Sequence, residues 1–336
     1  MRALIQKIRR GENLAPHEIE EVMCEIMSGE AVEQDVTDFL LALRDKGPTV
    51  AEITGAAKIM RQFAIEIKTK HKNILDTCGT GGDKKNTFNI STITALVVAG
   101  AGVAVAKHGN RSVSSQCGSA DILEALGVNL KVEKQRLSAC LDEVGIAFLF
   151  APHFHPAMKN VAPARKKLGV ETIFNILGPL TNPARATHQI LGVYSRELVE
   201  PMATVLKNLG LKRAVVVHGS DGLDEITTTG KTFISEYDGQ EIISYDITPE
   251  EMWLRPARLH DLKGGDLRTN VVICQEILNG KAGPQRDIVV LNAAYALYIA
   301  EAARSISQGL DMAQATIDSG KALKKLEELK AFTRKF

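Results

Sequence analysis

The sequence has few cysteines and almost no net charge. Its five cysteines are scattered, odd in number and never spaced as Cys-x-x-Cys, which argues against a disulfide framework or a structural zinc site. Lysine plus arginine total 41 against 40 for aspartate plus glutamate, so the formal net charge is +1. This balance gives no general electrostatic footprint for nucleic acid or an anionic membrane. Any anion must therefore be bound at a focused site.

Long hydrophobic segments are also missing. Residues 1–13 are charged and lack the apolar core of a signal peptide. The longest apolar run, residues 93–106, is interrupted by Thr94 and by glycines and is too short to span a bilayer. Together with unpaired thiols, these absences predict a soluble cytoplasmic enzyme without a membrane partner. A length of 336 residues suggests about two domains, and a hydrophobic content of 45% is enough for a sizeable core.

Residues 1–70 predict a small, all-helical domain. Apolar residues recur at helical spacing over residues 19–26 and 36–43, and Gly47-Pro48 ends the second of these segments. A capping-box pattern at residues 49–52 opens a third helix. So small a bundle leaves an apolar face exposed. That face predicts a docking or dimer surface, although packing within the chain is the simpler account.

Strand-like and helical segments alternate from about residue 71 to the C-terminus. Short apolar runs predict strands at residues 74–75, 103–106, 146–150, 190–193 and 214–217, followed by a hairpin over 232–237 and 241–245. Helical patterns lie near residues 91–100, 119–126, 133–144 and 196–209. Such alternation predicts an α/β domain over residues 71–336, with a mostly parallel central sheet covered by helices. Helices within residues 156–185 are expected to leave the sheet and join the small domain.

A glycine loop follows the first predicted strand. Gly79, Gly81 and Gly82 lie within four residues, just before a small apolar helix that begins at residues 89–92. Glycine permits close backbone approach, and the free amides at a helix start attract anions. The loop matches neither the P-loop nor the dinucleotide-binding fingerprint. Alone, it therefore supports phosphate binding and a simple chain turn about equally.

Two more polar segments follow predicted strands. Residues 107–115 combine two cations with three serine hydroxyls, which suits a polyphosphate or merely a solvated loop. Adjacent acids such as Asp224 and Glu225 are usually exposed, but beside phosphate loops they could recruit Mg²⁺, with Asp83 supporting it through water. Since ligands bind beyond the carboxyl ends of parallel strands, these segments should face one crevice.

Three basic side chains are further candidates. Arg165 lies in a helical region that could cover the crevice, where its guanidinium could grip a carboxylate. The simpler interpretation is a surface arginine beside two lysines. His108 and His155 are also candidate site groups, but a lone histidine is more often structural.

Six motifs occur in order along the chain. They are Gly79-Thr-Gly-Gly-Asp83, Asn89-Ile-Ser-Thr92, Lys107-His-Gly-Asn110, Cys117-Gly-Ser-Ala-Asp121, Asn175-Ile-Leu-Gly-Pro-Leu-Thr-Asn-Pro183 and Gly222-Leu-Asp-Glu225. Each is weak alone, but the ordered set resembles the anthranilate phosphoribosyltransferase family over essentially the whole chain. The family often has glycine after the first of these aspartates, whereas Lys84-Lys85 stands here and could stiffen or charge the loop.

The resemblance implies a fold like that of nucleoside phosphorylases and phosphoribosyltransferases, and a homodimer paired through the small domain. It implies transfer of the phosphoribosyl group of 5-phosphoribosyl 1-pyrophosphate to the amine of anthranilate in tryptophan biosynthesis, with about two Mg²⁺ per active site. It assigns no residue securely to catalysis. The implied contacts with phosphoribosyl pyrophosphate are Gly79, Gly82, Asp83, Thr87, Asn89, Ile90, Ser91, Thr92, Lys107, His108, Gly109, Asn110, Arg111, Ser112, Val113, Ser114, Ser115 and Ser119. The implied metal ligands are Ser91, Asp224 and Glu225, and the implied anthranilate contacts are Gly79, Asn110 and Arg165.

Two other functions are weighed against this one. A pyrimidine nucleoside phosphorylase of similar architecture would use phosphate as the nucleophile. The acids at 224 and 225 and the arginine at 165 favour a magnesium pyrophosphate and a carboxylate acceptor instead. A nucleic-acid-binding paralogue would keep the fold, but the near-zero net charge and intact loops disfavour it.

Overall fold

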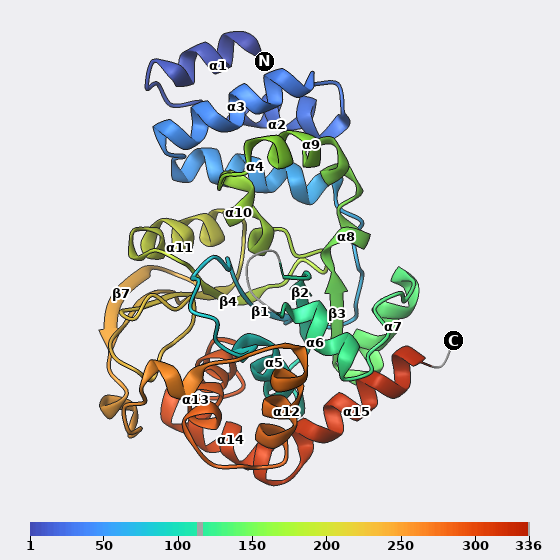
Figure 1. Cartoon of the computed structure of the whole chain (residues 1–336), viewed down its shortest axis with the longest axis vertical. Coiled ribbons are helices and arrows are strands. Elements are labelled where there is room, and N and C mark those ends of the chain that lie inside the picture. The colour runs from blue at the N-terminus through green and yellow to red at the C-terminus, as the bar shows by residue number, and fades with distance from the viewer. Residues whose placement is uncertain (113–116, 335–336) are drawn as a thin grey trace.

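The helices of the N-terminal part lie together at one end of the molecule (Figure 1). The computed structural model describes residues 1–112 and 117–334. The three predicted helices are confirmed, and a shorter one precedes them. Their bounds are α1 Arg2–Arg9, α2 Pro16–Ser28, α3 Glu33–Lys46 and α4 Val50–Phe63.

The predicted capping box at the start of α4 is present and is tied to a buried ion pair. Thr49 Oγ1 accepts a hydrogen bond from Glu52 N at 3.3 Å, and Glu52 Oε2 accepts one from Thr49 N at 2.7 Å. Lys46 Nζ lies 2.8 Å from the same carboxylate, which also accepts the Leu14 amide at 2.9 Å. The Glu52 side chain is fully buried. One carboxylate thus joins the α3–α4 turn to the segment before α2.

Replacing Glu52 with alanine is expected to lower the free energy of unfolding by about 3 kcal/mol, because it leaves a buried ammonium and two amides without their partner. Burial opposes ionisation of Glu52, but hydrogen bonds from Leu14 and Lys46 outweigh it and lower the carboxyl pKa below its ordinary value of 4.5. The stabilisation is therefore present above about pH 4.5 and lost below it. Urea unfolding between pH 3 and 7 (roughly the range over which such carboxylates titrate) measures both effects.

A matched control is Glu12→Ala, which breaks a surface pair with Arg10. Its expected cost is at most about 1 kcal/mol. Equal losses of stability in the two variants would show that the buried pair has no special role.

A seven-stranded sheet forms the centre of the larger part. Its strand order is β3-β2-β1-β4-β5-β6-β7, in which β3 to β5 are parallel and the last two strands add antiparallel. The predicted strands and hairpin are all found. Their bounds are β1 Leu75–Gly79, β2 Val105–Gly109, β3 Ile146–Phe150, β4 His188–Gly192, β5 Arg213–Gly219, β6 Thr232–Tyr237 and β7 Ile242–Ile247.

The structure corrects the predicted end of β2. Lys107, His108 and Gly109 are expected in a loop, but they continue the strand and pair with residues 148–150 of β3. The prediction fails because Lys107 and His108 are polar residue types that interrupt the apolar strand pattern in the sequence. In the structure both side chains are buried. The polar loop therefore begins at Asn110, and the lysine and histidine are held on the rigid sheet.

Helices cover both faces of this sheet (Figure 1). Successive residues of one strand alternate between two hydrophobic clusters, as the period of two requires. On β5, Val215 and Val217 belong to the cluster around α5 and α13, whereas Ala214 and Val216 face α11 and α4. The helix bounds are α5 Ile90–Gly100, α6 Ser119–Ala125, α7 Lys134–Val144, α8 Ala151–Phe154, α9 Ala162–Leu168, α10 Ile173–Leu177, α11 Val199–Asn208, α12 Leu267–Leu278, α13 Pro284–Ile299, α14 Ile306–Asp318 and α15 Lys321–Arg334.

The segment between β3 and β4 packs on the N-terminal helices. Helix α9 contacts α3, the 3₁₀ turn Pro156–Asn160 contacts α2, and α10 contacts α4. Figure 1 shows α9 lying among α2, α3 and α4, above the sheet. None of the described helices is long and apolar enough to cross a membrane.

Candidate functional site

The glycine loop wraps around a carboxylate from a distant loop. Asp224 follows β5, and its Oδ2 accepts a hydrogen bond from Gly81 N at 2.8 Å. A Cβ on Gly79, the last residue of β1, would overlap the same oxygen. Gly81 has φ +66, a conformation that favours glycine. The glycines at these two positions are thus needed for the backbone to approach Asp224.

The second acid meets the start of α5. Ser91 N donates to Glu225 Oε1 at 3.1 Å, so the carboxylate satisfies one of the free amides of the helix. Lys107 Nζ donates to Ser91 Oγ at 3.3 Å and to the carbonyl of Thr77. Three residues predicted for the site, Ser91, Lys107 and Glu225, are therefore brought together at the carboxyl ends of β1, β2 and β5.

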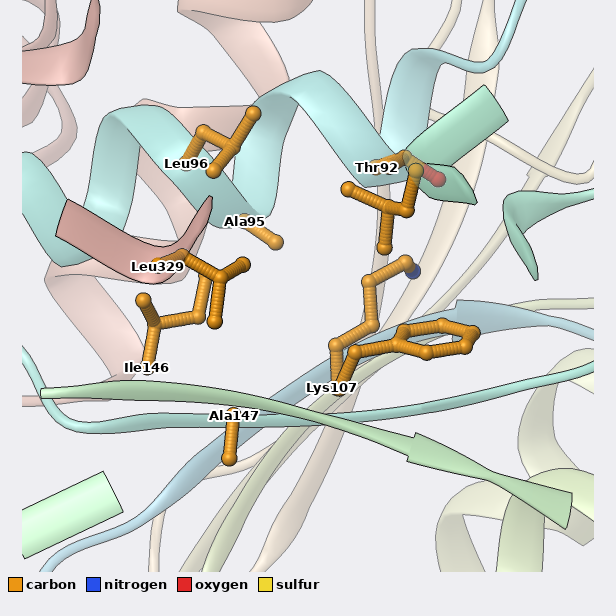
Figure 2. A pocket seen from close by; sticks show the side chains of 9 residues that line it. Thr92, Ala95, Leu96, Lys107, Ile146, Ala147 and Leu329 are labelled. Atoms are coloured by element: carbon orange, nitrogen blue, oxygen red, sulfur yellow. The ribbon is translucent and has the colours of Figure 1, made fainter. Parts of the chain in front are cut away.

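Figure 2 shows how Lys107 reaches this point. Its side chain crosses from β2 towards Thr92 at the start of α5, beside a cavity of about 10 Å³ that is otherwise lined by apolar side chains. This volume holds no more than about one water molecule and cannot be the substrate site. Lys107 is only 3% exposed, and its ammonium is held between the Thr77 carbonyl and Ser91 Oγ.

Three carboxyl groups crowd this end of the sheet. Burial, and then the charge of Asp83, raise the pKa of Asp224 to about 6, and the carboxyls of these two residues hydrogen-bond each other. Burial and the charge of Asp224 raise the pKa of Glu225 well above its ordinary value, although Lys107 opposes them. Like charges this close require either a shared proton or a cation. A divalent metal ion that is shared with a bound ligand would relieve this repulsion at Asp224 and Glu225.

The donor set fits a metal that is completed by substrate. Nowhere in residues 1–112 or 117–334 do three or more His, Cys, Asp or Glu side chains form a group able to hold a metal. Two carboxylates with the Ser91 hydroxyl are too few for a closed protein site. Mg²⁺ is commonly held in this way, through one or two carboxylates with phosphate oxygens and water.

Two buried histidines lie on the other side of β2. Nε2 of His108 is 3.2 Å from Nε2 of His155. Burial lowers the pKa of His108 to about 3 and that of His155 to about 4, so both are neutral at pH 7. His108 also hydrogen-bonds the carbonyl of Gly178, which fixes it as donor there and as acceptor towards His155. Nδ1 of His155 is then an acceptor, and it has no hydrogen-bond partner among the described residues.

Buried polar groups also hold the segment 178–182 against the sheet. Asn182 Nδ2 donates to Asp76 Oδ2 at 2.7 Å, and the other oxygen of Asp76 accepts the His108 amide at 3.2 Å. Gln189 of β4 and Arg61 of α4 donate to two successive carbonyls of the segment, at 2.8 Å and 2.7 Å. The segment 178–182, which includes the Gly178 contact of His108, is therefore held by side chains from both the sheet and the N-terminal helices.

Arg165 lies on α9, in the helical lobe that the N-terminal helices form with the segment between β3 and β4. Its Nη2 is 3.5 Å from Asn175 Oδ1, and its guanidinium carbon lies 5.8 Å from the ring centroid of Phe174. Burial lowers its pKa, and no carboxylate of the described chain forms an ion pair with it. A half-buried guanidinium with only neutral contacts can accept a carboxylate ligand.

The arginine of the segment after β2 forms ion pairs with α6 and not with Asp224 or Glu225. Arg111 pairs with Asp121 at 2.8 Å and with Glu124 at 2.7 Å, on α6. Asn110 is exposed, and its carbonyl accepts Ser119 Oγ at 3.2 Å. The amide of the next predicted residue, Ser112, donates to Asp121. Val113, Ser114 and Ser115 lie outside the described residues.

The other predicted contacts line the same region. Thr87 forms an isolated bridge with Lys263, and Asn89 Nδ2 donates to the Cys117 carbonyl at 3.0 Å. Thr92 Oγ1 is buried without a hydrogen-bond partner in the described structure. Ile90 is buried, Gly82 has φ +83, and Gly109 closes β2 against Ser119.

The unusual lysine pair has two different environments. Lys84 has φ +56, a conformation rare for a residue with a side chain. Lys85 Cε lies 2.7 Å from where a Cβ on Gly222 would stand, so this side chain covers the loop that leads to Asp224 and Glu225. The charge of Lys85 also lowers the pKa of Asp83, although burial prevails and the net shift is upward.

Several residues that hold this site together are not evident from the sequence. Arg61, Asn182 and Gln189 are buried, and their hydrogen bonds hold the segment 178–182. In the sequence each of them stands beside another polar residue, which is Gln62, Thr181 and His188 respectively. No local pattern therefore marks them as buried or indicates their partners.

Comparison with known proteins agrees with this geometry. A family model described as "Glycosyl transferase family, helical bundle domain" matches residues 2–64, and one described as "Glycosyl transferase family, a/b domain" matches residues 71–323. The anthranilate phosphoribosyltransferase of Acetivibrio thermocellus is 52% identical over 336 residues, which cover 100% of this chain and 97% of the relative.

Solved structures are similar over nearly the full length. That of anthranilate phosphoribosyltransferase from Thermus thermophilus has 44% identity and a TM-score of 0.93, covering 98% of this chain and 99% of that one. The Saccharomyces cerevisiae enzyme in complex with PRPP and Mg has 29% identity and a TM-score of 0.88, covering 96% and 94%. The yeast enzyme has also been solved with 4-fluoroanthranilate. With this similarity along its whole length, the chain belongs to the anthranilate phosphoribosyltransferase family.

Proposed function

We propose that this chain transfers the phosphoribosyl group of 5-phosphoribosyl 1-pyrophosphate to the amine of anthranilate. The products are N-(5-phosphoribosyl)anthranilate and pyrophosphate, and the step belongs to tryptophan biosynthesis. The observation that carries the proposal is the docking of both acids on the phosphate-binding elements, through Gly81 N to Asp224 at 2.8 Å and Ser91 N to Glu225 at 3.1 Å. This arrangement suits a metal pyrophosphate rather than a free phosphate.

The leaving pyrophosphate is assigned to the glycine loop. As the bond from the ribose C1 to pyrophosphate weakens, positive charge develops on the ribose and negative charge on the leaving group. The backbone of residues 79–83 and the positive end of the α5 dipole, with the ammonium of Lys107 nearby, would stabilise that negative charge. Mg²⁺ held by Ser91, Asp224 and Glu225 would supply further neutralisation when bound.

Anthranilate is assigned to the other side of the crevice. Arg165 would bind its carboxylate, and Asn110 with the backbone at Gly79 would orient the ring so that the amine faces C1. An aromatic amine is already nucleophilic, so no strong general base is required. The histidines at 108 and 155 are neutral at pH 7 and would leave this part of the crevice uncharged.

Further properties are proposed with this function. The contacts with phosphoribosyl pyrophosphate extend over Thr87, residues 89–92 and 107–115, and Ser119, and about two Mg²⁺ are bound per site. We assign residues 1–70 with helices of 156–185 to a small domain and residues 71–336 to the α/β domain. The chain acts as a cytoplasmic homodimer that pairs through the small domain, and it binds neither nucleic acid nor membrane.

Loss of anthranilate fluorescence tests the proposed reaction. Purified protein mixed with anthranilate, phosphoribosyl pyrophosphate and Mg²⁺ should consume the fluorescent acceptor, and omission of any one component should abolish the signal change. Folded protein that leaves anthranilate unchanged under these conditions would refute the assignment.

A further inference from the structure

One buried side chain outside the described site is bonded to the backbone beside its metal-binding acids. Asn292 lies in the middle of α13, is 1% exposed, and is flanked by the buried Leu291 and Ala293. Its side-chain amide both accepts from and donates to the backbone of one distant residue, Ile226. Ile226 N donates to Asn292 Oδ1 at 3.0 Å, and Asn292 Nδ2 donates to the Ile226 carbonyl at 2.8 Å.

This contact is placed directly after the two acids in the sequence. Asp224 and Glu225 hydrogen-bond the glycine loop and α5 only through their carboxylate oxygens, with which they must also reach a metal. Ile226, the next residue, is itself fully buried, and α13 is the element that satisfies both of its backbone groups. The loop backbone is thus anchored independently of the metal-binding oxygens.

A positioning function explains why an amide lies at this point of an apolar helix. Asparagine is unfavourable in helix interiors, and the neighbours of Asn292 along the helix, Leu291 and Ala293, are apolar and buried. Asn292 Nδ2 also donates its second hydrogen to the Ile288 carbonyl at 2.8 Å, which fixes the rotation of the side-chain amide.

We infer that Asn292 is a positioning residue for the magnesium site, holding the peptide after Glu225 so that Asp224 and Glu225 can share a metal with the substrate. This inference rests on the proposed function, since it assumes that the acids bind Mg²⁺ with phosphoribosyl pyrophosphate. Residues of this kind, which orient metal ligands without touching the metal, commonly change metal affinity by about 10–100-fold when replaced.

The test is Asn292→Leu, with Tyr295→Phe as matched control. Tyr295 lies one turn further along α13, is equally buried, and hydrogen-bonds Tyr245 away from the acids. Calorimetric titration of phosphoribosyl pyrophosphate at a series of Mg²⁺ concentrations gives the half-saturating Mg²⁺. We expect it to rise about 10-fold in Asn292→Leu and to stay unchanged in Tyr295→Phe, although both variants melt at lower temperature. The KM for anthranilate should be the same in both.

The outcomes separate the inference from the proposed function. If the wild type shows no Mg²⁺-dependent binding of phosphoribosyl pyrophosphate, the proposed function fails. If the wild type binds but Asn292→Leu has the Mg²⁺ dependence of Tyr295→Phe, only the inference fails. Should the leucine variant not fold, Asn292→Ser replaces it with the same expectation. In the wild type, the Ile226 amide should resist hydrogen exchange without Mg²⁺, and rapid exchange there would equally overturn the inference.

Discussion

Combining Asp224→Asn with Glu225→Gln is expected to lower kcat/KM by at least about 100-fold, as expected when charge stabilisation of a leaving group is removed. Each amide keeps an oxygen that can accept the existing hydrogen bond from Gly81 N or Ser91 N, so the loops should stay in place. The substitutions remove two negative charges that repel each other and Asp83. Steady-state rates over a Mg²⁺ series measure the effect, and higher Mg²⁺ should restore little activity.

Stability provides a second readout of the same variant. Without Mg²⁺, the neutral amides should leave the melting temperature unchanged or raise it, because the repulsion among the acids is gone. Asp246→Asn, which removes an exposed acid paired with Lys231 on the sheet edge, is a control for charge alone. Wild-type Mg²⁺ dependence in the double variant would mean that these acids are not metal ligands.

Arg165→Ala is expected to raise the KM for anthranilate by about 10–100-fold, because a hydrogen-bonded charge pair contributes about 1.5–3 kcal/mol. The KM for phosphoribosyl pyrophosphate should change little, since Arg165 lies in the helical lobe and contacts Asn175 rather than the phosphate loops. Arg165→Lys should recover only part of the loss, because an ammonium lacks the planar fork that binds both carboxylate oxygens.

Lys167→Ala is the control for this variant. Lys167 lies on the same helix, is exposed, and hydrogen-bonds Gln34 at 3.2 Å. Its removal should leave both KM values unchanged. If Arg165→Ala affected the two substrates equally, the arginine would not be the specific anthranilate ligand.

Much of the fold follows from local patterns in the sequence. Strand β3 and strand β6 have the predicted bounds, because uniform apolar or alternating runs end at clear turn signals. Helix α4 begins where its capping box predicts. The end of β2 is mispredicted because Lys107 and His108 are buried polar residues whose partners come from other parts of the chain.

Part of the site also follows from the sequence. The convergence of Ser91, Lys107 and the acids on one edge follows from the rule that parallel strands present their carboxyl ends together. Ser91, which could be no more than a helix cap in the sequence, lies against both Lys107 and Glu225. The anchoring contacts of Gln189 and Asn292 could not be predicted, because they join residues 10 and 66 positions apart without any repeated spacing.

Product identification by mass spectrometry is the most direct test of the proposed reaction. Wild-type protein with anthranilate, phosphoribosyl pyrophosphate and Mg²⁺ should form N-(5-phosphoribosyl)anthranilate and pyrophosphate in equal amounts, and a parallel reaction with thymidine or uridine plus phosphate should yield no free base. Release of thymine or uracil by protein that leaves anthranilate unmodified would contradict the proposed function and identify a nucleoside phosphorylase instead.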